Sequence, residues 1–237
     1  MPATSTGDRV RDRDIVGVVG ELLITAGVIV GLFAVYTLFW TGVETASEQE
    51  ALEEQFSSAG RDADPGAAAE SSPDATQEPA PEGAGPEPLS GDAYARLTIP
   101  RLGDAWRWIV VQGVDLDTLT RGPGHYPETV DPGEVGNFAV AGHRATYGEP
   151  FADLDRVQVG DEVRVERAGL MHTYVVTESF VTDPPDTDVL LPVPGQPGVE
   201  ADEAVLTLTT CHPRWSSSER LIVHATLVDT APVEEAA

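Results

Sequence analysis

The chain has 237 residues, of which 40 are acidic and 14 are basic, so its formal net charge at pH 7 is −26. This charge disfavours a nucleic-acid partner, because the phosphate backbone would be repelled. The length allows one core of ordinary size plus appendages, and the single cysteine excludes a disulfide within the chain.

The N-terminal region contains a candidate membrane anchor. Residues 22–40 carry no charged side chain, and Glu21 is the one interruption of an apolar run that begins at residue 15. A run of this length can cross a hydrocarbon core of about 30 Å. A cleaved signal peptide would have a shorter apolar core that ends in small residues, whereas this run ends in Phe39-Trp40. We therefore predict a transmembrane helix over residues 15–40.

The orientation of this helix follows from its flanks. Arg9, Arg11 and Arg13 precede the apolar run, and no basic residue follows it until Arg61. Basic residues are enriched on the cytoplasmic side of membrane spans. The sequence therefore predicts a single-pass cell-membrane protein, with residues 1–14 as a cytoplasmic tail and the remainder outside the cell.

The next segment, residues 41–92, has the composition of a linker. It is acidic and rich in Pro, Ala and Gly, and it contains few large apolar residues. Such a segment cannot bury enough surface to offset the entropy of ordering. Glu44–Phe56 could continue briefly as helix, and Asp64–Ser90 is expected to be a disordered extracellular spacer.

The remaining residues, 93–230, alternate short apolar runs with turn signals, which predicts a mainly β domain built as a small antiparallel barrel or sandwich. Short helices are expected at Asp115–Leu119 and Phe151–Leu154, and residues 231–237 are expected to form a disordered tail. The predicted strands are Arg96–Ile99, Trp106–Val111, Asn137–Ala141, Glu162–Glu166, His172–Phe180, Ala204–Cys211 and Arg220–Val228.

Three chemically useful residues lie at the ends of predicted strands. Cys211 ends one strand, Arg220 opens the next, and His143 follows an apolar run 68 positions before the cysteine. A thiol, a distant histidine and a nearby guanidinium are the parts of a cysteine acyl-transfer site. Alternation along the strand separates Leu206 and Leu208 from Cys211, which places the thiol on the more polar face.

Each of these residues has competitors. Cys211 could be a buried structural thiol, since free cysteine behaves as a small hydrophobe. His212 adjoins the cysteine, but neighbouring side chains on a strand point to opposite faces. The other rivals are His125, His172 and His224 for the acid/base role, and Arg144 and Arg214 for the guanidinium. No tight ligand spacing predicts a metal site, and no cofactor is expected.

The motif around the cysteine resembles a known family. Thr207-Leu208-Thr209-Thr210-Cys211 is similar to the Thr-Leu-x-Thr-Cys signature of sortases. Within that family, Cys211-His212-Pro213 and the following Arg-Trp-Ser-Ser-Ser-Glu-Arg resemble class E, the housekeeping class of many actinobacteria. The resemblance covers residues 93–229 and implies a closed eight-stranded β-barrel with short helices in its loops.

The resemblance also implies a reaction. Cys211 would attack the Thr-Gly bond of a C-terminal sorting motif, Leu-Ala-x-Thr-Gly or Leu-Pro-x-Thr-Gly, and form a thioester. His143 would protonate the leaving amine and then deprotonate an acceptor amine, while Arg220 would stabilise the oxyanion. The expected partners are surface proteins that bear a sorting signal and a lipid-linked peptidoglycan precursor.

Other functions stay open at this point. A sortase that polymerises pilins would use a lysine as its acceptor. A membrane-tethered cysteine hydrolase would release the same acyl group to water. A non-enzymatic adhesion or scaffold domain would require the cysteine, histidine and arginine to lie apart in the fold.

Overall fold

The computed structural model describes residues 7–62 and 89–233. The chain divides into two compact units, Met1–Thr41 and Gly42–Ala237. Helix α1 (Gly7–Asp62) begins in the first unit and ends in the second.

The first unit is helical from Gly7 onward. In the described parts of the chain, no helix is both long enough and apolar enough to cross a membrane. The predicted transmembrane helix over residues 15–40 is therefore not confirmed. Of the predicted cytoplasmic tail, residues 7–14 are helical, and residues 1–6 lie outside the described residues.

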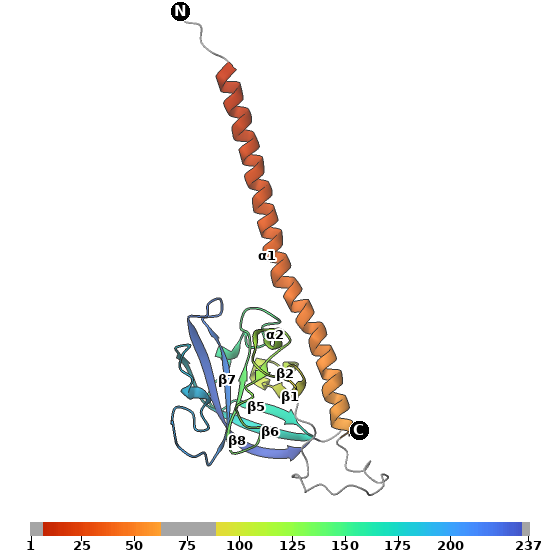
Figure 1. The fold of residues 1–237 in the computed structure, drawn as a ribbon, viewed down its shortest axis with the longest axis vertical. Helices are drawn as coiled ribbons and strands as arrows, with labels where there is room; N and C mark the ends of the chain where they lie inside the picture. The colour runs from red at the N-terminus through yellow and green to blue at the C-terminus, as the bar shows by residue number, and fades with distance from the viewer. Residues whose placement is uncertain (1–6, 63–88, 234–237) are drawn as a thin grey trace, which may run out of the picture. The chain divides into compact units, whose positions relative to one another are not determined.

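The second unit contains a closed eight-stranded barrel, as predicted (Figure 1). The strands follow each other around it in the order β1, β2, β3, β4, β7, β8, β6 and β5, and β5 pairs with β1. Two neighbouring pairs are parallel, β2 with β3 and β4 with β7, and the others are antiparallel. The strands are β1 (Ala93–Thr98), β2 (Arg107–Gln112), β3 (Gly124–His125), β4 (Gly136–Ala141), β5 (Glu162–Arg167), β6 (Leu170–Thr182), β7 (Ala204–His212) and β8 (Glu219–Pro232).

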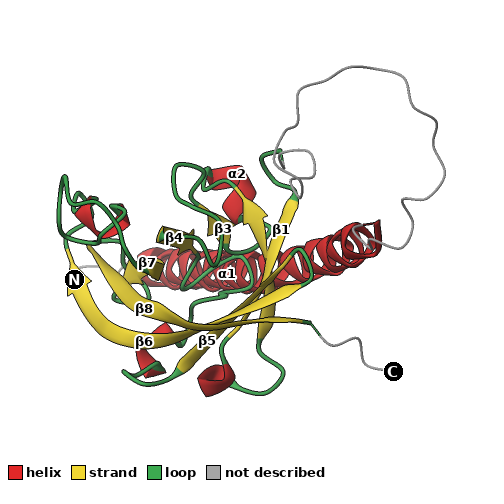
Figure 2. Ribbon diagram, turned by 90° about the horizontal axis from the view of Figure 1, so that it is seen from below, coloured by secondary structure: helices red, strands yellow, loops and turns green. Residues whose placement is uncertain are grey.

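All seven predicted strands appear, and only the two-residue β3 was not predicted. At the C-terminal end, the predicted disordered tail from Ala231 starts two residues too early, because Ala231 and Pro232 belong to β8. They pair with the start of β6, which is 13 residues long. Figure 2 shows these two long strands curving side by side. Residues 234–237 lie outside the described part.

Helices in the barrel loops are short. Helix α2 (Leu116–Leu119) begins where predicted, because the Asp115 carboxylate caps it by accepting a hydrogen bond from the Thr118 amide. The second predicted helix is shifted toward the C-terminus and is a 3-10 turn, η2 (Leu154–Arg156). Two further 3-10 turns are η1 (Pro100–Leu102) and η3 (Asp188–Leu190).

The barrel interior holds one hydrophobic core. Alternation along β7 turns Leu206 and Leu208 inward, where both are fully buried. Phe138 and Val140 of β4 enter the same cluster. The strand ends that bear the candidate site are therefore anchored by large apolar side chains on the opposite face.

A second, smaller cluster lies outside the barrel and involves the end of α1. Leu52 is 1% exposed and packs against Ile109 and Val111 of β2. The segment predicted as a linker, residues 41–92, thus includes a stretch of helix that packs on the barrel. Most of its predicted spacer, residues 63–88, lies outside the described residues.

Candidate active site

Two of the three predicted residues face each other across neighbouring strands. Cys211 of β7 and Arg220 of β8 are direct antiparallel partners. Side chains of directly opposite residues lie on the same face, with Cβ atoms about 4.5–5.5 Å apart. Cys211 is a free, half-buried thiol. The strands alone therefore place a nucleophile beside a guanidinium.

The face that bears Cys211 is polar but covered along most of its length. Thr207, two pairs further along β7, is fully buried, and its hydroxyl donates to the Asn137 side-chain oxygen at 2.7 Å. The Thr207 hydroxyl also lies 3.0 Å from Nδ1 of His224. Burial decreases toward Cys211, so the thiol lies at the open end of an otherwise covered face.

His143 reaches the same end of the barrel from β4. Strands β4 and β7 run parallel, and Ala141 is the register partner of Thr209. His143 and Cys211 each follow their member of this pair by two residues. The connection continues past β4, because the Gly142 amide donates to the Thr209 carbonyl at 3.1 Å. The histidine is therefore brought to the strand end that bears the thiol.

Further contacts fix the backbone at His143. The Thr210 hydroxyl donates to the Gly142 carbonyl at 2.7 Å, and the Phe151 amide donates to the His143 carbonyl at 3.0 Å. A Cβ at Gly142 would lie 2.6 Å from the Phe151 ring, so only glycine allows this close packing. A side chain at position 142 would displace either the ring or the histidine.

The His143 imidazole is partly buried. Among the described residues, no hydrogen-bond partner reaches its buried Nε2 atom. The ring lies against Tyr147, with centroids 4.9 Å apart. Burial lowers the pKa of His143 below its ordinary value. The neutral imidazole is therefore favoured at neutral pH, and neutral imidazole is the form that can accept the proton of a thiol.

Arg220 differs from the rival arginines in its partners. Its Nη1 atom donates to the backbone carbonyls of Ser217 and Glu219, at 3.1 and 3.0 Å. These contacts steady the side chain without neutralising it. In the described residues no carboxylate forms an ion pair with Arg220. Its charge is therefore not cancelled by a neighbouring carboxylate.

The rival Arg214 is occupied elsewhere. It forms an ion pair with Glu149, and its Nη1 lies 3.9 Å from Asp153. Its guanidinium also lies 5.4 Å from the centre of the Trp215 ring. These contacts tie the loop after β7 to the loop after β4.

Arg144 has a structural role that the sequence analysis did not identify. It is 4% exposed, with Nη2 2.9 Å from the Asp155 carboxylate and Nη1 2.7 Å from Nδ1 of His212. In the contact with His212, each partner directly follows a candidate catalytic residue, because Arg144 follows His143 and His212 follows Cys211. Because Cys211 and His212 are neighbours on β7, their side chains point to opposite faces, so Arg144 and His212 link the two segments on the face opposite the thiol.

The other histidines also have structural surroundings. His125 is 2% exposed and stacks on Tyr94 at 4.3 Å between ring centroids. Its ring nitrogens contact Gln112 and Thr129, and burial lowers its pKa to about 4. His172 contacts Thr230, and His224 contacts Thr207 and Phe180. Across the described ranges, no group of three or more His, Cys, Asp or Glu side chains could hold a metal ion.

This arrangement suits acyl transfer by a cysteine. A neutral imidazole and a thiol occupy adjoining strand ends, and a guanidinium without a carboxylate partner lies on the strand beside the thiol. The predicted residues His143, Cys211 and Arg220 thus come to one end of the barrel. Their catalytic roles stay predictions.

Comparisons with known proteins identify the family of the chain. The family model "Sortase domain" matches residues 97–228. The chain is 33% identical over 224 residues to Sortase SrtE1 of Streptomyces coelicolor, a match that covers 90% of this chain and 57% of that protein. It is 30% identical over 253 residues to Sortase SrtE2 of the same organism, covering 97% of this chain and 90% of that protein.

A solved structure is similar as well. Sortase E from Streptomyces avermitilis is 45% identical, with a TM-score of 0.55, and the match covers 61% of this chain and 93% of that one. Sortases are cysteine transpeptidases. The chain therefore belongs to the sortase family, and its similarities support a place in class E.

Proposed function

We propose that the protein is a cysteine transpeptidase that cleaves a C-terminal sorting motif between Thr and Gly and transfers the acyl group to an amine. One observation carries the proposal. Cys211 and Arg220 are opposite partners on β7 and β8, and the segment that bears His143 is hydrogen-bonded to β7 directly beside the cysteine.

The first half of the reaction follows from these groups. His143 takes the proton of the Cys211 thiol, and the thiolate attacks the carbonyl carbon of the motif's Thr. Arg220 donates hydrogen bonds to the oxyanion that forms. The C–N bond to Gly then breaks as His143 returns its proton to the leaving amine, and a thioester to Cys211 remains.

The second half uses the same groups in reverse. His143 removes a proton from the incoming amine, whose nitrogen attacks the thioester carbonyl. The C–S bond breaks, a new amide forms, and the Cys211 thiolate recovers its proton from His143. Water would give the hydrolysis product instead, so the fate of the thioester depends on which nucleophile reaches it.

We further propose that the enzyme is anchored in the cell membrane, with its N-terminus in the cytoplasm and its catalytic domain outside. Large apolar side chains of α1 are exposed between residues 18 and 33, among them Leu22, Ile24 and Phe33. Exposed apolar surface of this extent indicates an interaction with lipid or protein. Basic residues precede the run, which supports the orientation.

The proposed substrates follow from this placement and from class E. The acyl donor is a surface protein that ends in a sorting signal of the Leu-Ala-x-Thr-Gly or Leu-Pro-x-Thr-Gly type. The acceptor is the amine of a lipid-linked peptidoglycan precursor, so the product is a protein attached to the cell wall.

The test is incubation of the full-length chain in detergent with both peptides, with and without an added amine, and identification of the products by mass. A transpeptidase gives the amide product when amine is present. Release of the free acid in both conditions would indicate a hydrolase. The absence of any cleavage between Thr and Gly would overturn the proposal.

A further inference from the structure

We propose that the part of α1 from Thr45 to Phe56 is a positioning element of the active site, which holds the Tyr147-Gly148 turn against the His143 imidazole. This inference rests on the proposed function, because it concerns the residue that moves the protons. It assigns a role in catalysis to a segment that precedes the barrel by more than thirty residues.

The helix segment hydrogen-bonds to β2 where β3 is too short to reach. Strand β3 is two residues long and pairs with β2 only at Val111 and Gln112. Ile109, further back on β2, therefore has no strand partner on that side. The Gln49 side-chain amide takes the strand's place. It accepts from the Ile109 amide at 2.8 Å and donates to the Ile109 carbonyl at 3.1 Å.

The same side chain also binds the loop before β3. Its Nε2 donates to the Arg121 carbonyl at 2.8 Å. A Cβ at Gly122 would lie 2.4 Å from this nitrogen, so the glycine allows the approach. One glutamine thus joins β2 to the loop that leads to β3.

Apolar and charged contacts extend the docking along the helix. Leu52 covers Ile109 and Val111, with Phe56 beside them. Arg96 of β1 forms an ion pair with Glu53, and its guanidinium lies 4.8 Å from the centre of the Phe56 ring. The segment is therefore attached to the barrel over three helical turns, and its position there is fixed.

The helix also contacts the loop after β4 and the loop before β3. The Thr45 hydroxyl donates to the Thr120 carbonyl at 2.8 Å. Its methyl carbon faces Gly148. A Cβ added to Gly148 would lie 3.0 Å from the Thr45 methyl carbon and 2.7 Å from the Trp108 ring. Gly148 is therefore held between the helix and β2.

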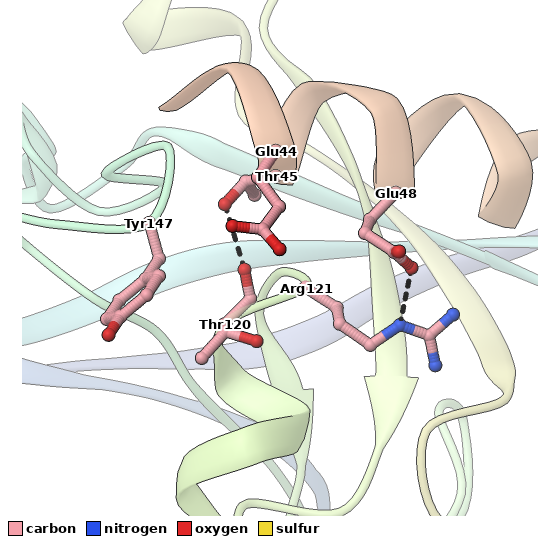
Figure 3. A pocket seen from close by; sticks show the side chains of 6 residues that line it. All are labelled: Glu44, Thr45, Glu48, Thr120, Arg121 and Tyr147. Atoms are coloured by element: carbon pink, nitrogen blue, oxygen red, sulfur yellow. Dashed lines mark hydrogen bonds and ion pairs between the residues drawn. The ribbon is translucent and has the colours of Figure 1, made fainter. Parts of the chain in front are cut away.

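A cavity of about 470 Å³ lies at this junction (Figure 3). Glu44, Thr45 and Glu48 line it from the helix, and Tyr147 lines it from the loop after β4. Figure 3 shows Tyr147 across the cavity from Glu48. The tyrosine therefore has the helix on one side.

The loop after β4 in turn contacts the histidine. Tyr147 has φ 52 and Gly148 has φ 72, both in the left-handed region. A tyrosine stays there only where its surroundings hold it. Its ring lies 4.9 Å from that of His143. If the helix is released, the turn loses its contact with Thr45. The His143 imidazole then loses the Tyr147 ring that lies against it.

The experiment compares four variants in the full-length chain. Gln49→Leu removes the three hydrogen bonds and keeps apolar bulk. Thr45→Ser keeps the hydroxyl and removes the methyl, whereas Thr45→Val keeps the methyl and removes the hydroxyl. Glu50→Ala is the control, because Glu50 lies exposed on the same helix. Peptide transfer is measured well below each variant's melting temperature.

If the segment positions His143, kcat falls about tenfold in Gln49→Leu and severalfold in Thr45→Ser, with KM unchanged, since small misplacements of a catalytic group are costly. Glu50→Ala stays within about twofold of wild type, and Thr45→Val, which keeps the methyl against Gly148 but loses the hydrogen bond to Thr120, lowers kcat less than Thr45→Ser. A merely structural role would make kcat independent of these contacts once the protein is folded. Unchanged kcat in both Gln49→Leu and Thr45→Ser would overturn the proposal.

A second readout does not depend on turnover. The Glu149 amide donates to the Thr146 carbonyl at 3.0 Å, so its hydrogen exchange reports on this turn. Exchange there rises about tenfold in Gln49→Leu and stays unchanged in Glu50→Ala. If wild type cleaves no peptide, the proposed function fails, but this exchange still tests the docking. Equal exchange in all variants would show that the helix does not hold the turn.

Discussion

Two junctions between neighbouring strands of the closed barrel, called here the β7–β8 edge and the β2–β3 edge, are completed in different ways. The difference shows which contacts a local sequence pattern can predict and which it cannot. At the β7–β8 edge, the strands themselves bring Cys211 and Arg220 together as register partners. At the β2–β3 edge, the strands pair only at Val111 and Gln112, and Gln49 of α1 supplies the hydrogen bonds to Ile109 further back on β2. The first edge is built from sequence neighbours, and the second depends on a segment 60 residues away.

Loss of the thiol is expected to have the largest effect. Cys211→Ala should abolish peptide cleavage, because the proposed reaction forms its thioester on this sulfur. The fold should persist, since the thiol is half-buried and its strand is held by Leu206 and Leu208 on the other face. Mass analysis of the products and circular dichroism of the variant check both parts. Turnover above a few per cent of wild type would show that another group attacks.

The contrast between the two edges also shows how far the sequence could predict the molecule. Alternation and turn signals predict seven of the strands, and the signature around Cys211 predicts the barrel through its resemblance to a family. The two-residue β3 leaves no periodic pattern. Gln49 lies in an acidic segment whose composition indicates a linker, and its contacts depend on where the barrel leaves backbone groups unpaired. That information exists only in the folded chain.

Within the candidate site the limits are similar. His143, Cys211 and Arg220 carry recognisable neighbours in sequence, so they could be proposed. The roles of Tyr147, Arg144 and His212 depend on contacts and burial that exist only in the folded protein. A positive φ at a tyrosine or a buried arginine has no sequence signal of its own. The position of Arg144 directly after His143 makes it a rival for the guanidinium role, but it does not predict the contact with His212.

The acid/base residue should show the next largest effect. His143→Ala is expected to lower kcat by about 10²–10⁴-fold, the range for general acid–base catalysis. His212→Ala should lower it much less, because His212 contacts Arg144 on the side away from the thiol. His125→Ala should mainly lower stability, since His125 is a core residue. Single-turnover rates of the folded fraction measure the loss in each variant. A loss in His125→Ala as large as that in His143→Ala would assign the acid/base role to His125 instead.

Arg220 should follow with a loss of about 10²–10³-fold, the cost of removing one oxyanion donor. Arg220→Lys and Arg220→Ala are both expected to fall by this factor, mainly in kcat, because lysine keeps the charge but not the forked geometry. Arg214→Ala is the matched control, since its guanidinium is paired with Glu149. Rates for Arg220→Lys within a few-fold of wild type would reduce Arg220 to a general electrostatic role.

At the other edge, the expected effects concern stability. Leu52→Ala removes a side chain that is 1% exposed and packs on Ile109 and Val111. Such a truncation costs about 2–5 kcal/mol of unfolding free energy. Leu89→Ala is the control, because Leu89 is 74% exposed, and it should stay within about 0.5 kcal/mol of wild type. Urea unfolding measures both, and equal values would show that the helix does not pack on β2 in solution.

The smallest effect should come from the ion pair at the margin of the same edge. Glu48 and Arg121 pair at 2.9 Å, but their side chains are 43% and 33% exposed. Solvent screening limits such a pair to about 1 kcal/mol or less. Glu48→Gln should therefore lower the unfolding free energy by less than about 1 kcal/mol, and 1 M salt should remove most of the difference from wild type. Arg121→Gln should cost more, because Arg121 also donates to the Gly91 carbonyl. A loss in Glu48→Gln as large as that in Leu52→Ala would mean that charge, rather than apolar packing, attaches the helix to the barrel.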